Sequence, residues 1–177
     1  GNIEGENILD EIIGGTVTLT EPIEGNIMKV LDVTAIAGDD VVIEIEVLNE
    51  DEFCAFQFDI PLPEGFGYVQ ESIGLNPARI TNHQAMANVL PNTNIFRAVA
   101  FSLTNASFLG NDGVLTFFTF TTPEVPGVYT LNINDDAILG NIEGENILDE
   151  IIGGTVTLIT GDLYTVTLTL KIRISSQ

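Results

Sequence analysis

Several residue types are scarce in this sequence, and each scarcity excludes a class of function. The single cysteine, Cys54, cannot form a disulfide within the chain, and together with the single histidine, His83, it offers too few ligands for an ordinary zinc site. With one cysteine and one histidine, most catalytic pairs of a nucleophile and a base could form in only one way. The absence of tryptophan and the presence of only three tyrosines leave few aromatic surfaces on which sugar rings can stack. We therefore expect no enzymatic activity.

Positive charge is scarce as well. Five basic residues stand against 26 acidic ones, and the formal net charge is −21. Such a surface repels the phosphates of nucleic acids and anionic lipid headgroups, while it favours cations and basic partners. No apolar stretch approaches the roughly 20 residues that a membrane helix needs. We expect neither nucleic-acid binding nor membrane insertion.

One segment occurs twice. Residues 1–19 read GNIEGENILDEIIGGTVTL, and residues 140–158 read the same nineteen letters one ordinary domain length later. This identity predicts a tandem array of near-identical modules, in which residues 20–158 form one complete module. Residues 1–19 are then the tail of a preceding module, or a donor or extra strand.

The complete module has the pattern of a β protein. Residues 41–48 and 53–60 alternate apolar and polar positions with a period of two, and the second run ends at a proline- and glycine-rich cluster, residues 61–65. Similar runs predict strands at residues 95–103, 114–120, 128–133 and 153–158. A short helical turn is expected only at residues 8–13 and in their copy, residues 147–152. The prediction is an all-β sandwich or jelly roll with these phenylalanines in its core: Phe56, Phe58, Phe101, Phe118 and Phe120.

The last nineteen residues, 159–177, predict an additional amphipathic strand. Val166, Leu168 and Leu170 alternate with polar residues, and the alternation continues through Ile172 and Ile174. Because the module is already complete at Leu158, this strand either extends an edge of its own sheet or pairs with an edge elsewhere.

The order of strands and turns resembles the cohesin family, whose modules hold dockerin-bearing proteins on bacterial surface scaffolds. The resemblance covers roughly residues 26–158 and is a pattern of strand starts and turns rather than a chemical motif. It is carried by four stretches: residues 33–40, 56–65, 111–117 and 153–158. It implies a jelly-roll β-sandwich of about nine strands, to which the amphipathic C-terminal strand is an addition. It also implies an extracellular, non-catalytic module with one sheet face able to bind a dockerin.

Calcium is the ligand that the sequence favours, because hard cations prefer carboxylate and amide oxygens on loops. Asp135, Asp136, Asn141 and Glu143 supply such oxygens close together in the sequence. Their spacing does not match the twelve-residue EF-hand loop, so the predicted site is irregular. The sequence nevertheless favours an acidic turn without a ligand over a bound ion.

Three functions remain open at this point. The first is a protein-binding module of a secreted or cell-surface scaffold. The second is a structural subunit of a surface filament or adhesin array, in which strands pass between neighbouring copies because the duplicated segments have identical side chains. The third is a carbohydrate-binding module, against which the scarcity of aromatic residues counts. The residues expected to take part in strand exchange are Thr16, Val17, Leu19, Thr155, Val156, Leu158, Val166, Leu168 and Leu170.

Overall fold

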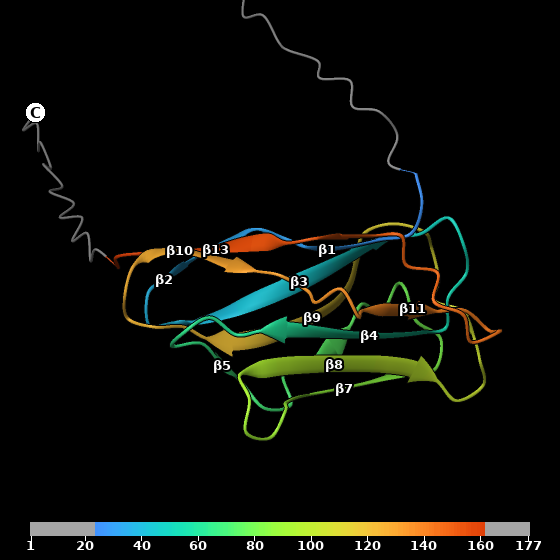
Figure 1. Ribbon diagram of the computed structural model, residues 1–177, viewed down its shortest axis with the longest axis horizontal. Helices are drawn as coiled ribbons and strands as arrows, with labels where there is room; N and C mark the ends of the chain where they lie inside the picture. The colour runs from blue at the N-terminus through green and yellow to red at the C-terminus, as the bar shows by residue number, and fades with distance from the viewer. Residues whose placement is uncertain (1–23, 162–177) are drawn as a thin grey trace, which may run out of the picture.

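The computed structural model describes residues 24–161. Within that range all regular secondary structure is β-strand (Figure 1). No helix in this range is long and apolar enough to cross a membrane. Residues 1–19 and the amphipathic strand expected near the C-terminus lie outside the described residues. The strands are β1 (Ile27–Val30), β2 (Val33–Ile36), β3 (Asp40–Leu48), β4 (Ala55–Pro61), β5 (Gly67–Tyr68), β6 (Gly74–Leu75), β7 (His83–Val89), β8 (Ile95–Ser102), β9 (Val114–Thr121), β10 (Gly127–Leu131), β11 (Ile138–Gly140), β12 (Glu150–Ile152) and β13 (Gly154–Ile159).

The strands form two layers. One layer combines a sheet of order β12-β1-β3-β9-β5, with β6 also on β9, and a three-stranded sheet of order β10-β13-β2. The other layer is a four-stranded sheet of order β11-β4-β8-β7, which lies along the lower side of Figure 1. The expected all-β sandwich is confirmed.

The first and last strands of the described chain run side by side in the same direction. β12 pairs parallel with β1, and β13 pairs parallel with β2. Parallel neighbours at the two ends of a chain place the beginning of the first strand and the end of the last at opposite ends of the sheet. In Figure 1 the chain accordingly enters at the right of the sandwich and leaves at the left.

The core between the layers is rich in phenylalanine. Phe56, Phe58, Phe118 and Phe120 are at most 2% exposed. The expectation for Phe101 is wrong: it is only half-buried and points away from the core, and Phe96 occupies the interior instead. The reason is that β8 carries apolar residues on both of its faces, so alternation alone does not reveal which face points inward.

The short helical turn expected at residues 147–152 is also absent. Asp149 N and Glu150 N donate hydrogen bonds to the carbonyl of Asn26, and the chain continues as β12 alongside β1. Pairing with β1, more than a hundred residues earlier in the chain, overrides the local helical pattern of this segment.

A buried arginine connects the end of β3 to the loop before β9. Arg79 is 3% exposed, and its guanidinium donates hydrogen bonds to the carbonyls of Val47, Leu109 and Gly113 and to Asn49 Oδ1. Burial lowers the pKa of this side chain, which nevertheless keeps its proton because arginine holds it so strongly. One cation therefore binds acceptors from β3, from the segment after it and from the loop before β9.

Replacing Arg79 by methionine should lower the free energy of unfolding by about 3 to 5 kcal/mol, because each acceptor left buried and unpaired costs about 1 to 3 kcal/mol. Urea denaturation measures this change. A loss below about 1 kcal/mol would show that water or neighbouring groups satisfy these carbonyls equally well.

His83 begins the edge strand β7 and is buried, with its ring stacked on Phe108 at a centroid distance of 3.7 Å. Burial lowers the pKa of its imidazole below the ordinary 6.5. The unfolded chain therefore takes up a proton near pH 6.5 that the folded chain resists. This contribution to stability is complete above that pH and is lost as the pH falls below it.

The variant His83→Phe keeps an aromatic ring against Phe108 but cannot titrate. Between about pH 7.5 and 5.5 its melting temperature should fall less than that of the wild type. Melting curves at matched ionic strength provide the comparison. If the melting temperatures of the two proteins fell equally with pH, His83 would not be the group responsible.

Candidate functional site

The outer face of the β11-β4-β8-β7 sheet is the candidate site, and we call it the neutral face. Side chains alternate along each strand, so the residues that do not enter the core share this face. It is formed by Ile138 and Gly140 of β11; Ala55, Gln57 and Asp59 of β4; Phe101, Val99 and Arg97 of β8; and Gln84, Met86 and Asn88 of β7.

The strand registers arrange these side chains in rows across the sheet. The middle row runs from Ile138 through Gln57 and Val99 to Met86. It crosses all four strands and carries no charge. The apolar side chains of this row are accessible, since Met86 is 55% and Ile138 38% exposed.

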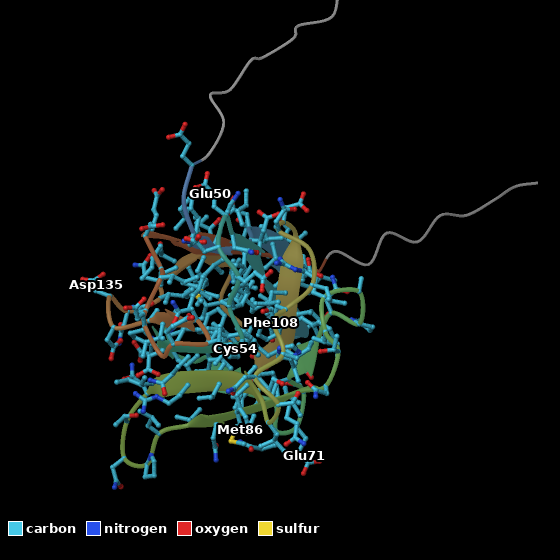
Figure 2. The ribbon with its side chains drawn as sticks, turned by 90° about the vertical axis from the view of Figure 1, so that its right-hand side faces the viewer. Glu50, Cys54, Glu71, Met86, Phe108 and Asp135 are labelled. Carbon is cyan, nitrogen blue, oxygen red and sulfur yellow. The ribbon has the colours of Figure 1, made fainter. Side chains whose placement is uncertain are left out.

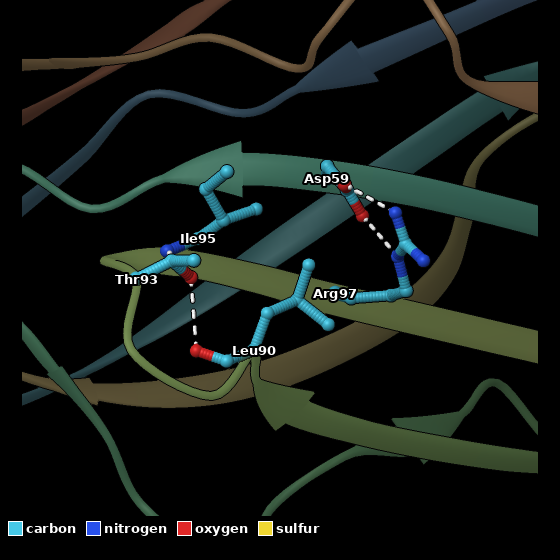
Figure 3. A network of polar contacts seen from close by, with 5 residues as sticks. All are labelled: Asp59, Leu90, Thr93, Ile95 and Arg97. Atoms are coloured by element: carbon cyan, nitrogen blue, oxygen red, sulfur yellow. Dashed lines mark hydrogen bonds and ion pairs between the residues drawn. The ribbon is translucent and has the colours of Figure 1, made fainter.

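The next row contains the only two charged side chains of the face, and they neutralise each other. Asp59 and Arg97 are directly opposed in register, and the guanidinium donates from Nε to Oδ1 and from Nη2 to Oδ2, both at 2.7 Å (Figure 3). The hydrogen bonds that Arg97 donates to Asp59 hold the pKa of Arg97 above its ordinary value. Beside the pair, Thr93 closes the β7–β8 hairpin by donating its hydroxyl to the carbonyl of Leu90.

A shallow groove of about 310 Å³ runs along the β7 side of the neutral face. It is lined by Met86, Ala87, Asn88, Leu90, Arg97 and Val99. Figure 2 shows Met86 projecting from the lower side of the molecule, and Glu71 borders a second hollow with it. On the opposite side of the face, the charge of Asp136 acts on Arg97. Apart from Asp59, which is paired with Arg97, the acidic side chains thus lie at the border of the face.

The amino-acid sequence carries a signal for this face that strand periodicity does not capture. Residues 72–111 contain no aspartate or glutamate, although 26 acidic residues are spread through the rest of the chain. This stretch includes β7 and β8. The long gap in acidic residues marks two of the four strands of the neutral face.

The residues expected to bind calcium do not form one cluster. Asp135 lines a hollow together with Asp149 and Glu150, whereas Asn141 Oδ1 accepts a hydrogen bond from Glu145 N within a tight turn. Across residues 24–161, no three histidine, cysteine or acidic side chains are close enough together to hold a metal ion. Calcium binding stays a prediction.

The described residues expected in strand exchange all lie in β13. Val156 and Leu158 are buried, and Thr155 donates from its backbone N and its hydroxyl to Asp32 Oδ1. The hydrogen bonds from Thr155 lower the pKa of Asp32. The other residues expected to exchange are Thr16, Val17, Leu19, Val166, Leu168 and Leu170, and they lie outside the described range.

No protein-family model matches the chain, and no curated protein matches its sequence. Solved structures do match. The sixth cohesin of scaffoldin B from Acetivibrio cellulolyticus, in complex with a variant Cel5 dockerin, has a TM-score of 0.62 and 14% identity, over 77% of this chain and all of that one. The seventh ScaB type I cohesin from Pseudobacteroides cellulosolvens has a TM-score of 0.62 and 15% identity, over 81% and 99% of the two chains.

A third match is a non-cellulosomal cohesin from the archaeon Archaeoglobus fulgidus, with a TM-score of 0.61 and 16% identity over 77% of this chain and 93% of that chain. The fold is cohesin-like. At these identities the likeness concerns the fold alone, and it agrees with the jelly-roll sandwich that the resemblance implies.

The ion pair on the neutral face can be tested separately from binding. Arg97→Met leaves the buried carboxylate of Asp59 without its partner and should lower the free energy of unfolding by about 2 to 3 kcal/mol. The double variant Asp59→Leu with Arg97→Met removes both charges and should be less destabilised than Arg97→Met alone. Urea denaturation of the wild type and the two variants measures these free energies. A double variant less stable than Arg97→Met would contradict the prediction.

Proposed function

We propose that the chain is a non-catalytic module that holds a partner protein on the neutral face. The observation that carries this proposal is the distribution of charge. A chain with a formal net charge of −21 keeps one flat sheet face free of unpaired charge and places exposed apolar side chains at its centre. Depletion of charge at the centre of an apolar patch is typical of protein interfaces.

The size of the neutral face indicates what else the partner must contact. Three strands of seven or eight residues and one of three residues, spaced about 4.8 Å apart, cover on the order of 400 Å². A stable interface needs about 800 Å² on each partner. The acidic border, with Glu71 on one side and Asp136 on the other, must therefore contribute. The fitting partner has an apolar centre surrounded by basic side chains.

A dockerin-like domain is the partner class that we propose. Several cohesins with the same fold were solved in complex with dockerins, among them the sixth cohesin of scaffoldin B. The flat neutral face suits such a partner because it has no deep cleft for a small substrate. We further propose that the module belongs to an extracellular scaffold on a bacterial surface.

The variant Met86→Asp places a charge in the middle row of the neutral face and should weaken binding of a dockerin-bearing protein from the same organism by roughly 10- to 100-fold. The matched control is Val42→Asp on β3, a residue that is 49% exposed on the other layer and should change affinity by less than about threefold. Isothermal titration calorimetry with purified proteins measures both. Equal losses for the two variants, or no binding by the wild type to any such protein, would refute the proposal.

A structural role in a filament is the second candidate. The described chain enters and leaves the sandwich at opposite ends, so modules joined through these ends line up along the long axis (Figure 1). This arrangement and the duplicated segment favour an extended array of modules.

A further inference from the structure

The segment that occurs twice closes the sandwich in the described structure. Residues 140–158 contain β12 and all of β13 except its last residue. β12 pairs with β1, and β13 lies between β10 and β2. We call the space that this segment fills the closing slot. Val156 and Leu158 are at most 2% exposed, so the slot is part of the core.

Polar contacts fix the position of the segment in the slot. Asp149 Oδ2 accepts hydrogen bonds from the backbone N and the side-chain amide of Asn26, at 2.8 and 3.2 Å. Farther along, Asp32 Oδ1 accepts the two hydrogen bonds from Thr155, at 2.7 and 2.9 Å. Asn26 and Asp32 belong to the slot, whereas Asp149 and Thr155 belong to the segment.

Residues 1–19 have the same side chain at every one of these positions. Asp10 corresponds to Asp149, Thr16 to Thr155, Val17 to Val156 and Leu19 to Leu158. The slot therefore cannot distinguish the two copies by their side chains. What distinguishes them is how each is connected to the rest of the chain.

The connection of residues 1–19 is too short for this copy to fill the slot of its own molecule. In the register of β13, Leu19 would lie beside Ala35, as Leu158 does. Ala35 is eight residues beyond Ile27 along β1 and β2, roughly 25 Å away. The five residues from Leu19 to Glu24 span at most about 18 Å, and Glu24 precedes Ile27. The connecting segment is therefore too short for residues 1–19 to fill the slot of their own molecule in register.

We propose that residues 1–19 of one molecule close the sandwich of a second molecule by taking the place of its residues 140–158. Each molecule then offers its own residues 1–19 to the next, so the contact is head-to-tail and builds open chains or rings. The partner is a second copy of this chain. The contact lies at the closing slot and leaves the middle row of the neutral face free.

The energetics indicate when this exchange occurs. The contacts in the slot are the same for both copies, so only the connection differs. The resident copy is tethered at an effective concentration on the order of millimolar, which favours it about a thousandfold over a copy supplied at micromolar concentration. We therefore expect the wild-type chain to be monomeric at micromolar concentration. A substitution that prevents residues 140–158 from binding in the slot should favour exchange.

Gly154 offers a way to damage the resident copy alone. A Cβ atom at this position would lie 2.5 Å from the carbonyl oxygen of Val30, a backbone atom that cannot move aside cheaply. Gly154→Val in the full chain should disable residues 140–158 and leave residues 1–19 intact. The corresponding position in the other copy is Gly15, so Gly15→Val is the matched control.

Light scattering after size exclusion and circular dichroism test the three variants at tens of micromolar. Gly154→Val should form folded head-to-tail oligomers, Gly15→Val should remain a folded monomer, and the double variant should neither fold nor form these oligomers. A folded monomer of Gly154→Val would show closure within one molecule and overturn the proposal. The proposal also fails if the double variant assembles in the same way.

A peptide arm covers the case in which the substitutions simply prevent folding. A fluorescent peptide of residues 1–19 should bind the double variant with a stoichiometry of one to one and restore its strand signal, whereas the same peptide with Gly15→Val should do neither. Fluorescence anisotropy and circular dichroism provide the readouts. Equal behaviour of the two peptides would mean that the slot does not accept this segment, and the exchange would be refuted.

Discussion

The packing of phenylalanine rings between the layers determines most of what the molecule presents to solvent. Phe96 lies 4.4 Å from Phe118 and 6.5 Å from Phe58, measured between ring centroids, so β4 and β8 are held to β9 with these faces inward. Because side chains alternate along a strand, this orientation of β4 and β8 places Asp59, Arg97 and Val99 on the outer face. The ion pair and the uncharged row are consequences of the core. A shift of one residue in either strand would bury a charge and separate Asp59 from Arg97.

Much of the fold follows from local patterns, whereas the site does not. The strands β3, β8 and β9 lie within about a residue of where alternation predicts them, since each buries one face of a regular strand. β12 is short and is held by its pairing with β1, more than a hundred residues earlier, which no local pattern reveals. Arg79 is equally invisible from the sequence, because its acceptors are backbone carbonyls brought together by the fold.

The error at Phe101 shows why the site was harder to predict. An apolar residue on a strand is expected in the core because burial normally stabilises it. On a face that binds another protein the same residue type belongs outside, so the usual pattern is broken where a partner docks. Acidic residues are a better guide in this chain. Their absence from residues 72–111 fits the proposed docking on this face, because desolvating a charge beneath a partner is costly whichever way a strand faces.

The neutral face and the closing slot meet at β11, and this links the two kinds of contact. Gly140 is the first residue of the duplicated segment and also the residue of β11 that pairs with Ala55. Its carbonyl accepts a hydrogen bond from Cys54 N, while Ile138 lies two residues earlier in the middle row. A partner that presses Ile138 and β11 against β4 therefore also holds the start of residues 140–158. Anything that binds only the closed sandwich stabilises it by mass action, whichever copy of the duplicated segment fills the slot.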